Sequence, residues 1–384
     1  MNYSRSRKIT PVKSITVLMT VSNAFSNDPR ASKEARSLAQ AGFHVVVYAL
    51  DRTLSSSEAE CKEGIMVKRL KARLPYGRVA RALVVMPIFI LFCMVQSLAY
   101  RPQITHCHDF DTLIVGLVNK LLFQSKLVYD AHEHYPSMIK AIIPLPMFYL
   151  IAILDRFFTS AADCVIVPSR HRARLYSTAR RVIELPNVPN RAGIVRSHRD
   201  SDAFTIYYGG SLSRETAIVK LIRLASRSRD LRLVLAGDGP LRAFVEKAAS
   251  SPNVTYLGRV ARSTSLELLG GSDLTVVMYE PCNLNNVYAC SNKLFEAMMV
   301  GVPIVTNKET VMSEIVEGEA CGLTVPYYDD VALEQAILSL KQDPALRRKL
   351  GDNGRTASQK YCWESVEKRL LLGYKELLHG SNRS

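Results

Sequence analysis

The fold of this 384-residue chain is decided by residues 291–305, which read SNKLFEAMMVGVPIV. Helical spacing places Leu294 and Met298 on one buried side of a helix. Gly301 suits a helix C-terminus, and the apolar run at 302–305 is typical of a short buried strand. The stretch therefore predicts a helix that leads directly into a strand.

The start of this predicted helix has the chemistry of an anion site. Ser291 or Asn292 can cap it, and its first backbone N–H groups are available to an anion. Lys293 adds a positive charge, and Glu296, one turn further on, can accept hydrogen bonds from two sugar hydroxyls. The pattern fits the phosphate and ribose of a nucleotide, but it also fits an ordinary capped helix.

Composition narrows the class of protein. Hydrophobic residues make up 48% of the chain and charged residues 22%, which is typical of a globular protein of two or three domains. The eight cysteines form no CxxC pair, which favours reduced, mostly buried thiols over disulfides or a zinc site. The first thirteen residues are polar and basic, and the apolar run at 15–19 is too short for a signal peptide. A cytoplasmic protein is therefore expected.

The positive charge is concentrated in the first half of the chain. Residues 1–200 carry 28 Lys and Arg against 14 Asp and Glu, a net of +14, whereas residues 201–384 carry 22 against 21. A basic half predicts an anionic partner. Without a helix-turn-helix pattern or interleaved arginine and aromatic residues, a lipid surface or a phosphorylated substrate is favoured over nucleic acid.

The first half predicts a β-α-β pattern with polar residues after its strands. The loop after the strand at 15–19 contains Asp28 and Arg30, and the latter is either a phosphate ligand or a solvated side chain. Other polar clusters follow the strands at 103–107 and 126–129, where ligands bind in open α/β sheets. They contain His108, Asp109, Asp130, His132 and Glu133. No metal-binding spacing such as HExxH is present, and no metal is expected.

Residues 82–100 form an apolar run that is long enough to cross a bilayer. Pro87 interrupts it, and a strand follows almost at once. A crossing would place two parts of one sheet on opposite sides of the membrane, so we reject it. Two alternatives remain: a core helix, or an interfacial helix with a basic flank.

A second alternation of strands and helices follows a polar, proline-containing linker at 191–203. Its strands are predicted at 204–208, 231–236, 254–257 and 274–278, and residues 291–305 close the series. Residues 331–378 are predicted to be helical. Gly237-Asp238-Gly239 begins like a dinucleotide fingerprint but lacks the third glycine, which disfavours NAD binding.

The motifs, in this order, resemble those of retaining glycosyltransferases of family 4. They are Asp28-Pro-Arg30 with Glu34-Ala35, His108-Asp-Phe110, Tyr129-Asp-Ala-His-Glu133, Gly209-Gly-Ser211, Leu235-Ala-Gly-Asp-Gly-Pro240, residues 291–303, and Cys362-Trp-Glu364. The resemblance covers essentially the whole chain. It implies a GT-B fold of two facing Rossmann-like α/β domains with parallel sheets, at 1–190 and 204–365. A C-terminal helix at 366–384 would cross back to the first domain.

The resemblance also implies roles for individual residues. Catalytic roles fall to His108, His132 and Glu133, and acceptor-side roles to Asp28, Arg30 and Asp109. The donor-binding residues would be Gly209, Gly210, Ser211, Arg214, Gly237, Asp238, Tyr288, Ser291, Asn292, Lys293, Leu294 and Glu296. Two positions depart from the family pattern. Tyr288 replaces the first Glu of a frequent Glu-x7-Glu pair. After the first strand of the second domain, many relatives have a basic residue followed by glycine, whereas this chain has Arg214-Glu-Thr216.

The sequence thus predicts a metal-independent, retaining hexosyltransferase that needs no cofactor. It would use a UDP- or GDP-linked sugar donor and a lipid-linked or oligosaccharide acceptor in surface polysaccharide synthesis. The basic first half predicts a peripheral location on the inner face of the plasma membrane. Two alternatives stay open: a GT-B protein that binds nucleotide-sugar or membrane without turnover, and an NAD-dependent oxidoreductase.

Overall fold

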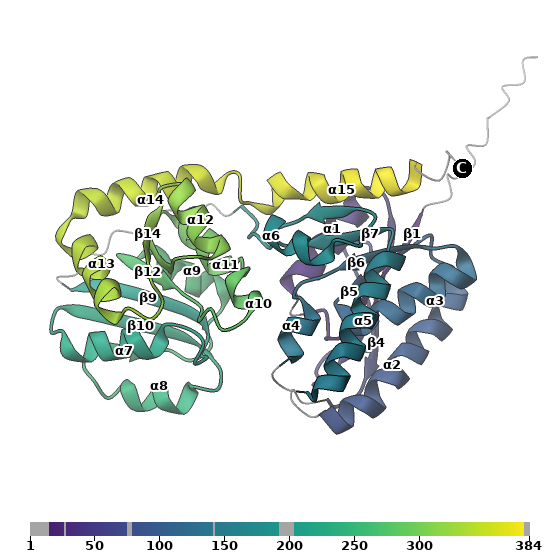
Figure 1. Ribbon diagram of the computed structural model, residues 1–384, viewed down its shortest axis with the longest axis horizontal. Coiled ribbons are helices and arrows are strands. Elements are labelled where there is room, and N and C mark those ends of the chain that lie inside the picture. Colours follow the sequence, from purple (N-terminus) through teal and green to yellow (C-terminus); the bar gives the residue numbers. More distant parts are fainter. Residues whose placement is uncertain (1–14, 27, 75–78, 141–142, 192–202, 380–384) are drawn as a thin grey trace, which may run out of the picture. The chain divides into compact units, whose positions relative to one another are not determined.

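The computed structural model describes residues 15–26, 28–74, 79–140, 143–191 and 203–379, and it divides into two compact units (Figure 1). Unit 1 comprises residues 1–167, 176–184 and 369–384. Unit 2 comprises residues 168–175 and 185–368. Segment 168–175, predicted within the first domain, therefore groups with the second. Most of the predicted linker, and the basic N-terminus, lie outside the described residues.

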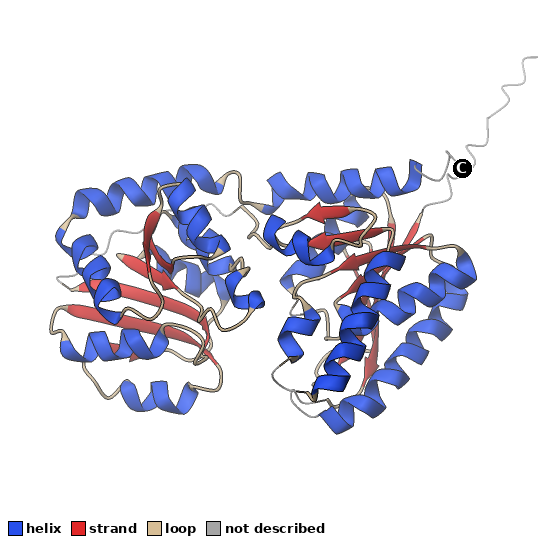
Figure 2. Ribbon diagram, in the orientation of Figure 1, coloured by secondary structure: helices blue, strands red, loops and turns tan. Residues whose placement is uncertain are grey.

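Unit 1 is built on an eight-stranded sheet whose order is β3-β4-β2-β1-β5-β6-β7-β8. Figure 2 shows strands in red with helices in blue around them. All neighbouring strands are parallel except β3 and β4, which form an antiparallel hairpin. The strands are β1 (Thr16–Val21), β2 (His44–Asp51), β3 (Ala59–Lys62), β4 (Ile65–Lys71), β5 (Ile104–His108), β6 (Lys126–Asp130), β7 (Cys164–Val167) and β8 (Val182–Glu184).

Helices cover this sheet on both faces. Helix α2 packs against strand residues such as Leu18 and Val46 through Phe89 and Cys93, and these apolar side chains form one buried core cluster. On the other face, Glu34 of α1 and Tyr374 of α15 both reach His106 of β5. The helices of this part of the chain are α1 (Pro29–Gln40), α2 (Val79–Tyr100), α3 (Leu113–Phe123), α4 (Tyr135–Ile139), α5 (Leu145–Ala161), and the short turns η1 (Phe110–Thr112) and η2 (Arg174–Tyr176).

Unit 2 is built on a six-stranded, fully parallel sheet of order β11-β10-β9-β12-β13-β14. Its strands are β9 (Phe204–Ser211), β10 (Leu231–Asp238), β11 (Val254–Tyr256), β12 (Leu274–Val277), β13 (Ile304–Asn307) and β14 (Gly322–Val325). Its helices are α6 (Arg170–Ala173), α7 (Ile218–Arg227), α8 (Arg242–Ala248), α9 (Arg262–Gly270), α10 (Leu284–Val287), α11 (Asn292–Val300), α12 (Val311–Gly318), α13 (Asp330–Gln342), α14 (Pro344–Ser358) and the start of α15 (Trp363–His379).

The central stretch forms the predicted helix and strand. Ser291 is the N-cap of α11, and its hydroxyl accepts a hydrogen bond from the backbone N–H of Lys293. Leu294 and Met298 are fully buried, and Gly301 ends the helix at a φ of 78°, in the left-handed region that glycine tolerates. The strand begins at Ile304, after Val302 and Pro303.

One sequence expectation about the elements was wrong. Residues 291–305 do not close the second sheet, because α12 and β14 add another helix and strand at its edge. As expected, the eight cysteines form no disulfide; five of them are buried.

Candidate functional site

A polar cluster forms in unit 1 where the strand order of its sheet changes direction. β1 lies between β2 and β5, and the loop after β1 leads into α1 at Asp28. The carboxyl ends of β5 and β6 bring His108 and Asp130 opposite each other in register. Such a switch point is where open α/β sheets bind ligands. The predicted residues after β1, β5 and β6 therefore do come together.

Arg30 forms the buried ion pairs of this cluster. Its side chain is almost fully buried and donates from Nε and Nη2 to the two carboxylate oxygens of Asp130, at 2.8 and 2.6 Å. Glu34, one turn along α1, lies 3.2 Å from the Nε. The alternative of a solvated arginine in a loop is therefore wrong for Arg30. It belongs to α1, which starts at Pro29 because Asp28 caps it.

Two histidine rings lie above this ion pair. His132 Nε2 is 2.8 Å from Asp130 Oδ2 and 3.0 Å from His108 Nδ1, and Asp109 approaches the other nitrogen of His132 at 3.5 Å. His108 is buried, and its Nε2 has no hydrogen-bond partner among the described residues. That nitrogen is itself shielded from solvent in this structure. Glu133, by contrast, has an exposed side chain.

The pKa values follow from this crowding of charges. Burial alone would lower the pKa of His132, but the carboxylates of Asp109 and Asp130 raise it to about 10. Burial also opposes ionisation of Asp130, yet Arg30 and then His132 hold its pKa well below the usual range. Burial, and then the charge of Asp130, raise the pKa of Glu34 to about 7. His132 and Asp130 are therefore both charged at neutral pH.

The same cluster contains the one group of possible metal ligands found among the described residues. Atoms of Glu34, His106, His108 and Asp130 all lie within 4.8 Å of one another. The guanidinium of Arg30, however, already contacts both carboxylates. A buried divalent cation beside that guanidinium would meet strong electrostatic repulsion.

The predicted donor site in unit 2 is organised around Lys293 at the start of α11. Its Nζ donates to Tyr208 Oη at 2.8 Å and lies 4.1 Å from the centre of that ring. Burial lowers the pKa of Lys293, but Tyr279 and Tyr208 outweigh it and raise the pKa, so the amine stays charged. Tyr279 also donates to Ser291 Oγ at 3.2 Å. Two tyrosines thus fix a cation at a helix N-terminus.

Glycines let the backbone approach Lys293. A Cβ on Gly210 would lie 2.6 Å from Lys293 Cε, and a Cβ on Gly237 would lie 1.8 Å from the carbonyl oxygen of Gly210. Both have positive φ, at 141° and 136°. The ends of β9 and β10 therefore close against the start of α11, where backbone amides and a positive charge can hold a phosphate.

Glu296 faces outward one turn into α11. Its Oε1 accepts a hydrogen bond of 3.1 Å from Nε of Arg262, which lies on the neighbouring helix α9. Asn292 adds a buried side-chain oxygen with no hydrogen-bond partner in the described part of the chain. At the end of β10, Asp238 accepts from the backbone of Gly239 and from Arg259.

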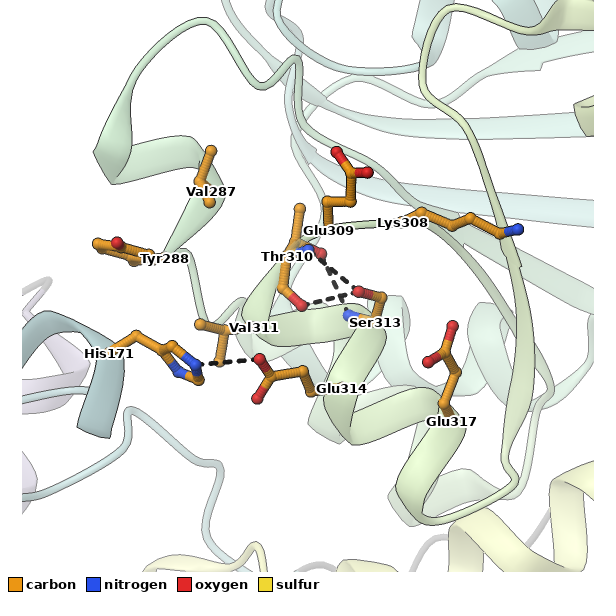
Figure 3. A pocket seen from close by; sticks show the side chains of 10 residues that line it. All are labelled: His171, Val287, Tyr288, Lys308, Glu309, Thr310, Val311, Ser313, Glu314 and Glu317. Atoms are coloured by element: carbon orange, nitrogen blue, oxygen red, sulfur yellow. Dashed lines mark hydrogen bonds and ion pairs between the residues drawn. The ribbon is translucent and has the colours of Figure 1, made fainter.

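Four predicted donor-binding residues lie away from Lys293 or point elsewhere: Leu294, Arg214, Ser211 and Tyr288. Leu294 belongs to the core, because its side chain is fully buried and its backbone N–H bonds to the carbonyl of Ser291. Arg214 is exposed, as is Ser211 at the end of β9. Tyr288 lines an open pocket of about 480 Å³ (Figure 3).

The pocket lies at the start of α12 in unit 2. The ring of Tyr288 lies 5.9 Å from that of His171, and His171 Nε2 is 3.0 Å from a carboxylate oxygen of Glu314 (Figure 3). Thr310 and Ser313 cap α12 reciprocally, and each hydroxyl accepts a hydrogen bond from the backbone N–H of the other residue. Of the predicted donor-binding residues, the pocket includes Tyr288 alone.

Sequence reasoning assigned no role to several residues that build these sites. Glu34 follows Arg30 by four residues on a helix, a spacing that signals an ion pair. His106 precedes His108 by two residues on a strand, so both rings share a face and stack with centroids 4.5 Å apart. No motif or spacing in the sequence marks Tyr208, Arg262 or Tyr374 as part of a site.

Comparison with protein families decides the assignment. Residues 32–187 match the model of glycosyltransferase family 4, and residues 204–343 match that of the group 1 glycosyl transferases. The chain belongs to glycosyltransferase family 4. An NAD-dependent oxidoreductase is thereby excluded, in agreement with the missing third glycine.

Curated relatives in this family are distant. An alpha-D-kanosaminyltransferase of Streptomyces kanamyceticus is 24% identical over 196 residues, 49% of each chain. The lipopolysaccharide core biosynthesis glycosyltransferase LpsD of Rhizobium meliloti is 28% identical over 156 residues, 40% of this chain and 44% of that one. The matches span about half the length of these relatives.

Solved structures share the two-unit GT-B fold. A sucrose-phosphate synthase from Thermosynechococcus elongatus has a TM-score of 0.80 at 19% identity, covering 95% of this chain and all of that one. The Anabaena protein HepE, in complex with UDP-glucose, has a TM-score of 0.71 at 15% identity and covers 94% of this chain and all of its own. The predicted GT-B fold is confirmed.

Proposed function

We propose that this family 4 protein is a retaining hexosyltransferase that moves a sugar from a UDP- or GDP-sugar to a lipid-linked glycan. The acceptor would serve surface polysaccharide synthesis at the cytoplasmic face of the membrane. The observation that carries the proposal is the charged Lys293, fixed by Tyr208 at the start of α11 beside Gly210. This is a positive, glycine-lined site for a diphosphate.

The donor half of the proposal rests on unit 2. The start of α11 and Lys293 would hold the diphosphate, and Glu296, oriented by Arg262, would bind the ribose hydroxyls. HepE, which shares the fold, was solved with UDP-glucose. The relative LpsD is named for lipopolysaccharide core synthesis, which supports a glycan acceptor.

The acceptor half rests on unit 1. His108 would present its unpartnered Nε2 to a sugar hydroxyl, while the charged pair of Asp130 and His132 fixes its ring. The acceptor hydroxyl would attack the anomeric carbon from the face that the diphosphate leaves, so the configuration is retained. The bond from that carbon to the phosphate oxygen breaks, and the leaving phosphate takes the acceptor proton. Lys293 and the helix N-terminus would stabilise the developing charge without a metal.

Nucleotide binding tests the donor site directly. We would measure thermal shifts with UDP, GDP, ADP and their sugars, with a chelator and no added metal, for wild type, Glu296→Ala and Glu267→Ala. Glu267 is an exposed residue of α9 and serves as the matched control. A ligand at a hundred times its Kd stabilises by about 2.7 kcal/mol. One nucleotide should stabilise wild type and Glu267→Ala but not Glu296→Ala.

Turnover separates the enzyme from a binding-only protein. Tyr288 stands where many relatives have a glutamate, and this departure motivates the alternative of nucleotide-sugar or membrane binding without transfer. Slow hydrolysis of the bound donor by wild type, lost in His108→Ala, would support the enzyme. Tight nucleotide binding with no hydrolysis or transfer to any glycan would favour the alternative. No shift with any nucleotide would refute the donor site.

A further inference from the structure

Unit 1 carries an exposed apolar face built by α2, α3 and α5. Helix α2 packs beside α3, and α3 beside α5, so the three form a continuous layer (Figure 1). Large apolar side chains point outward from all three, for example Leu83 and Leu91 on α2, Leu122 on α3, and Leu150, Ile153 and Phe157 on α5. We call this surface the α2–α5 face. Large apolar side chains exposed together on adjoining helices are typical of an interaction site.

Helix α5 differs from an ordinary surface helix in burying two polar side chains beside Phe158 and exposing several large apolar ones. Asp155 and Thr159 are buried, whereas Leu150, Ile153 and Phe157 on the same helix are exposed. In a helix that faces water, the polar side chains point outward and the apolar ones inward. The outward face of α5 is therefore built to meet an apolar environment.

The packing of α2 indicates that the apolar environment lies against the outside of unit 1 and is not crossed by the helix. Within the described ranges, the segment Arg81–Tyr100 is the one helix long and apolar enough to span a membrane, and 22% of that window is buried. The buried residues Val85, Phe89 and Cys93 recur every four residues and pack in the core of unit 1. If α2 crossed a bilayer, these three buried residues would leave the core of unit 1. The exposed apolar side of α2 can therefore meet a membrane only with the helix lying parallel to the membrane surface.

Charge identifies the occupant of the face. Asp155 is the only acidic residue in the sequences of α2, α3 and α5, and it is buried. The basic residues of these helices are Arg81, Lys120 and Arg156, and the first and last of them are exposed. A second copy would bring positive charge against positive charge and provide no exposed carboxylate to pair with it. An anionic lipid surface matches both the apolar side chains and the charge.

We propose that the α2–α5 face docks onto an anionic membrane, with its apolar side chains at the headgroup–acyl boundary and Arg81 and Arg156 at lipid phosphates. This inference rests on the proposed function, because it would bring the His108 cluster of unit 1 to a membrane-embedded acceptor. It names the surface that makes the contact and excludes a transmembrane role for α2.

Vesicle binding tests the docking face. The full chain would be sedimented with vesicles of phosphatidylcholine alone and of equal parts phosphatidylcholine and phosphatidylglycerol. Ile153→Glu is compared with Val331→Glu, a helical position of unit 2 with nearly the same exposure, 66% against 64%. Burying a charge in place of an apolar side chain should weaken binding of Ile153→Glu to the mixed vesicles by about tenfold or more. Val331→Glu should bind like wild type.

Two arginine variants test the electrostatic contribution to vesicle binding. Arg81→Gln and Arg156→Gln should each weaken binding to the mixed vesicles by about fivefold and leave the weak binding to pure phosphatidylcholine unchanged. Leu83→Ser, on α2, provides a second apolar test if Ile153→Glu does not fold. The nucleotide thermal shift is measured on every variant, and it should stay as in wild type. Loss of vesicle binding with an intact nucleotide shift separates the docking face from the donor site.

Three outcomes would overturn the inference. The first is that wild type does not sediment with either kind of vesicle. The second is that both Ile153→Glu and Leu83→Ser bind the mixed vesicles as well as wild type. The third is that sedimentation velocity shows a dimer that Ile153→Glu dissociates, which would assign the face to a second copy of the chain.

Discussion

Arg30 has a larger structural role than its position at the start of a helix suggests. Its guanidinium contacts two buried carboxylates, those of Asp130 and Glu34, which come from strand β6 and helix α1. Removing one partner of a buried ion pair leaves an uncompensated charge and costs far more than the pair contributes in water. The stability of the His108 cluster therefore depends on this one side chain.

Replacing Arg30 tests that dependence. Arg30→Met should destabilise the protein by about 3–5 kcal/mol, since the buried carboxylate of Asp130 would lose its two-point contact with the guanidinium and keep only the histidines. Arg36→Met on the same helix is the control: Arg36 pairs with Glu63, both are exposed, and such pairs contribute about 0–1 kcal/mol. Chemical unfolding followed by circular dichroism measures both. Equal losses for the two variants would contradict the buried ion pair.

At the scale of elements, helix α5 combines an exposed apolar face with a buried carboxylic acid. Asp155 accepts a hydrogen bond of 3.2 Å from Tyr129 Oη on β6. Burial nevertheless dominates and raises the pKa of Asp155 from 3.8 to about 6. The folded protein thus keeps this proton at pH values where the unfolded chain has lost it. The contribution of Asp155 to stability falls as pH rises between these two values.

Asp155→Asn should remove that pH dependence. Across the window from pH 3.8 to about 6, wild type should lose about 3 kcal/mol of stability relative to the variant, because the shift is about two pKa units. Urea unfolding at a series of pH values measures the difference. Above pH 7 the variant should be the more stable protein. Parallel stability profiles for the two proteins would show that Asp155 does not titrate in this window.

At the scale of the whole molecule, the chain returns to its first unit at its C-terminal end. Residues 369–384 belong to unit 1, and within them Tyr374 is fully buried, with its hydroxyl 2.6 Å from His106 Nδ1. The His106 ring stacks on that of His108. The last helix therefore supports the predicted catalytic histidine through one intervening ring.

Removing the Tyr374 side chain tests this support. Tyr374→Ala should destabilise unit 1 by about 3–5 kcal/mol, because it opens a cavity and removes the hydroxyl that contacts His106 Nδ1. Leu372→Ala, on the exposed side of the same helix, should change stability by about 0.5 kcal/mol or less. In Tyr374→Ala, amide hydrogen exchange should become faster at β5. The exchange rates of the strands of unit 2 should stay as in wild type. Unaltered exchange at β5 would argue against the contact as a support.

The sequence alone determined the elements that local chemistry controls. The capped helix at 291–300, its glycine end, the parallel alternation of both halves and the family all follow from periodicity and short motifs, which act within a few residues. The positions of His108, Asp109 and His132 after strands followed as well, because parallel strands end at one edge of a sheet.

Only the tertiary structure decided which distant residues meet. Arg30 with Asp130, Lys293 with Tyr208, and His106 with Tyr374 are separated by 100, 85 and 268 residues, and strand order rather than periodicity brings them together. The two alternatives for residues 82–100 proved compatible: one stripe of α2 packs in the core, and the other is exposed. Apolar composition reveals that a helix has apolar surface, whereas the packing of its neighbours determines which part of that surface is covered.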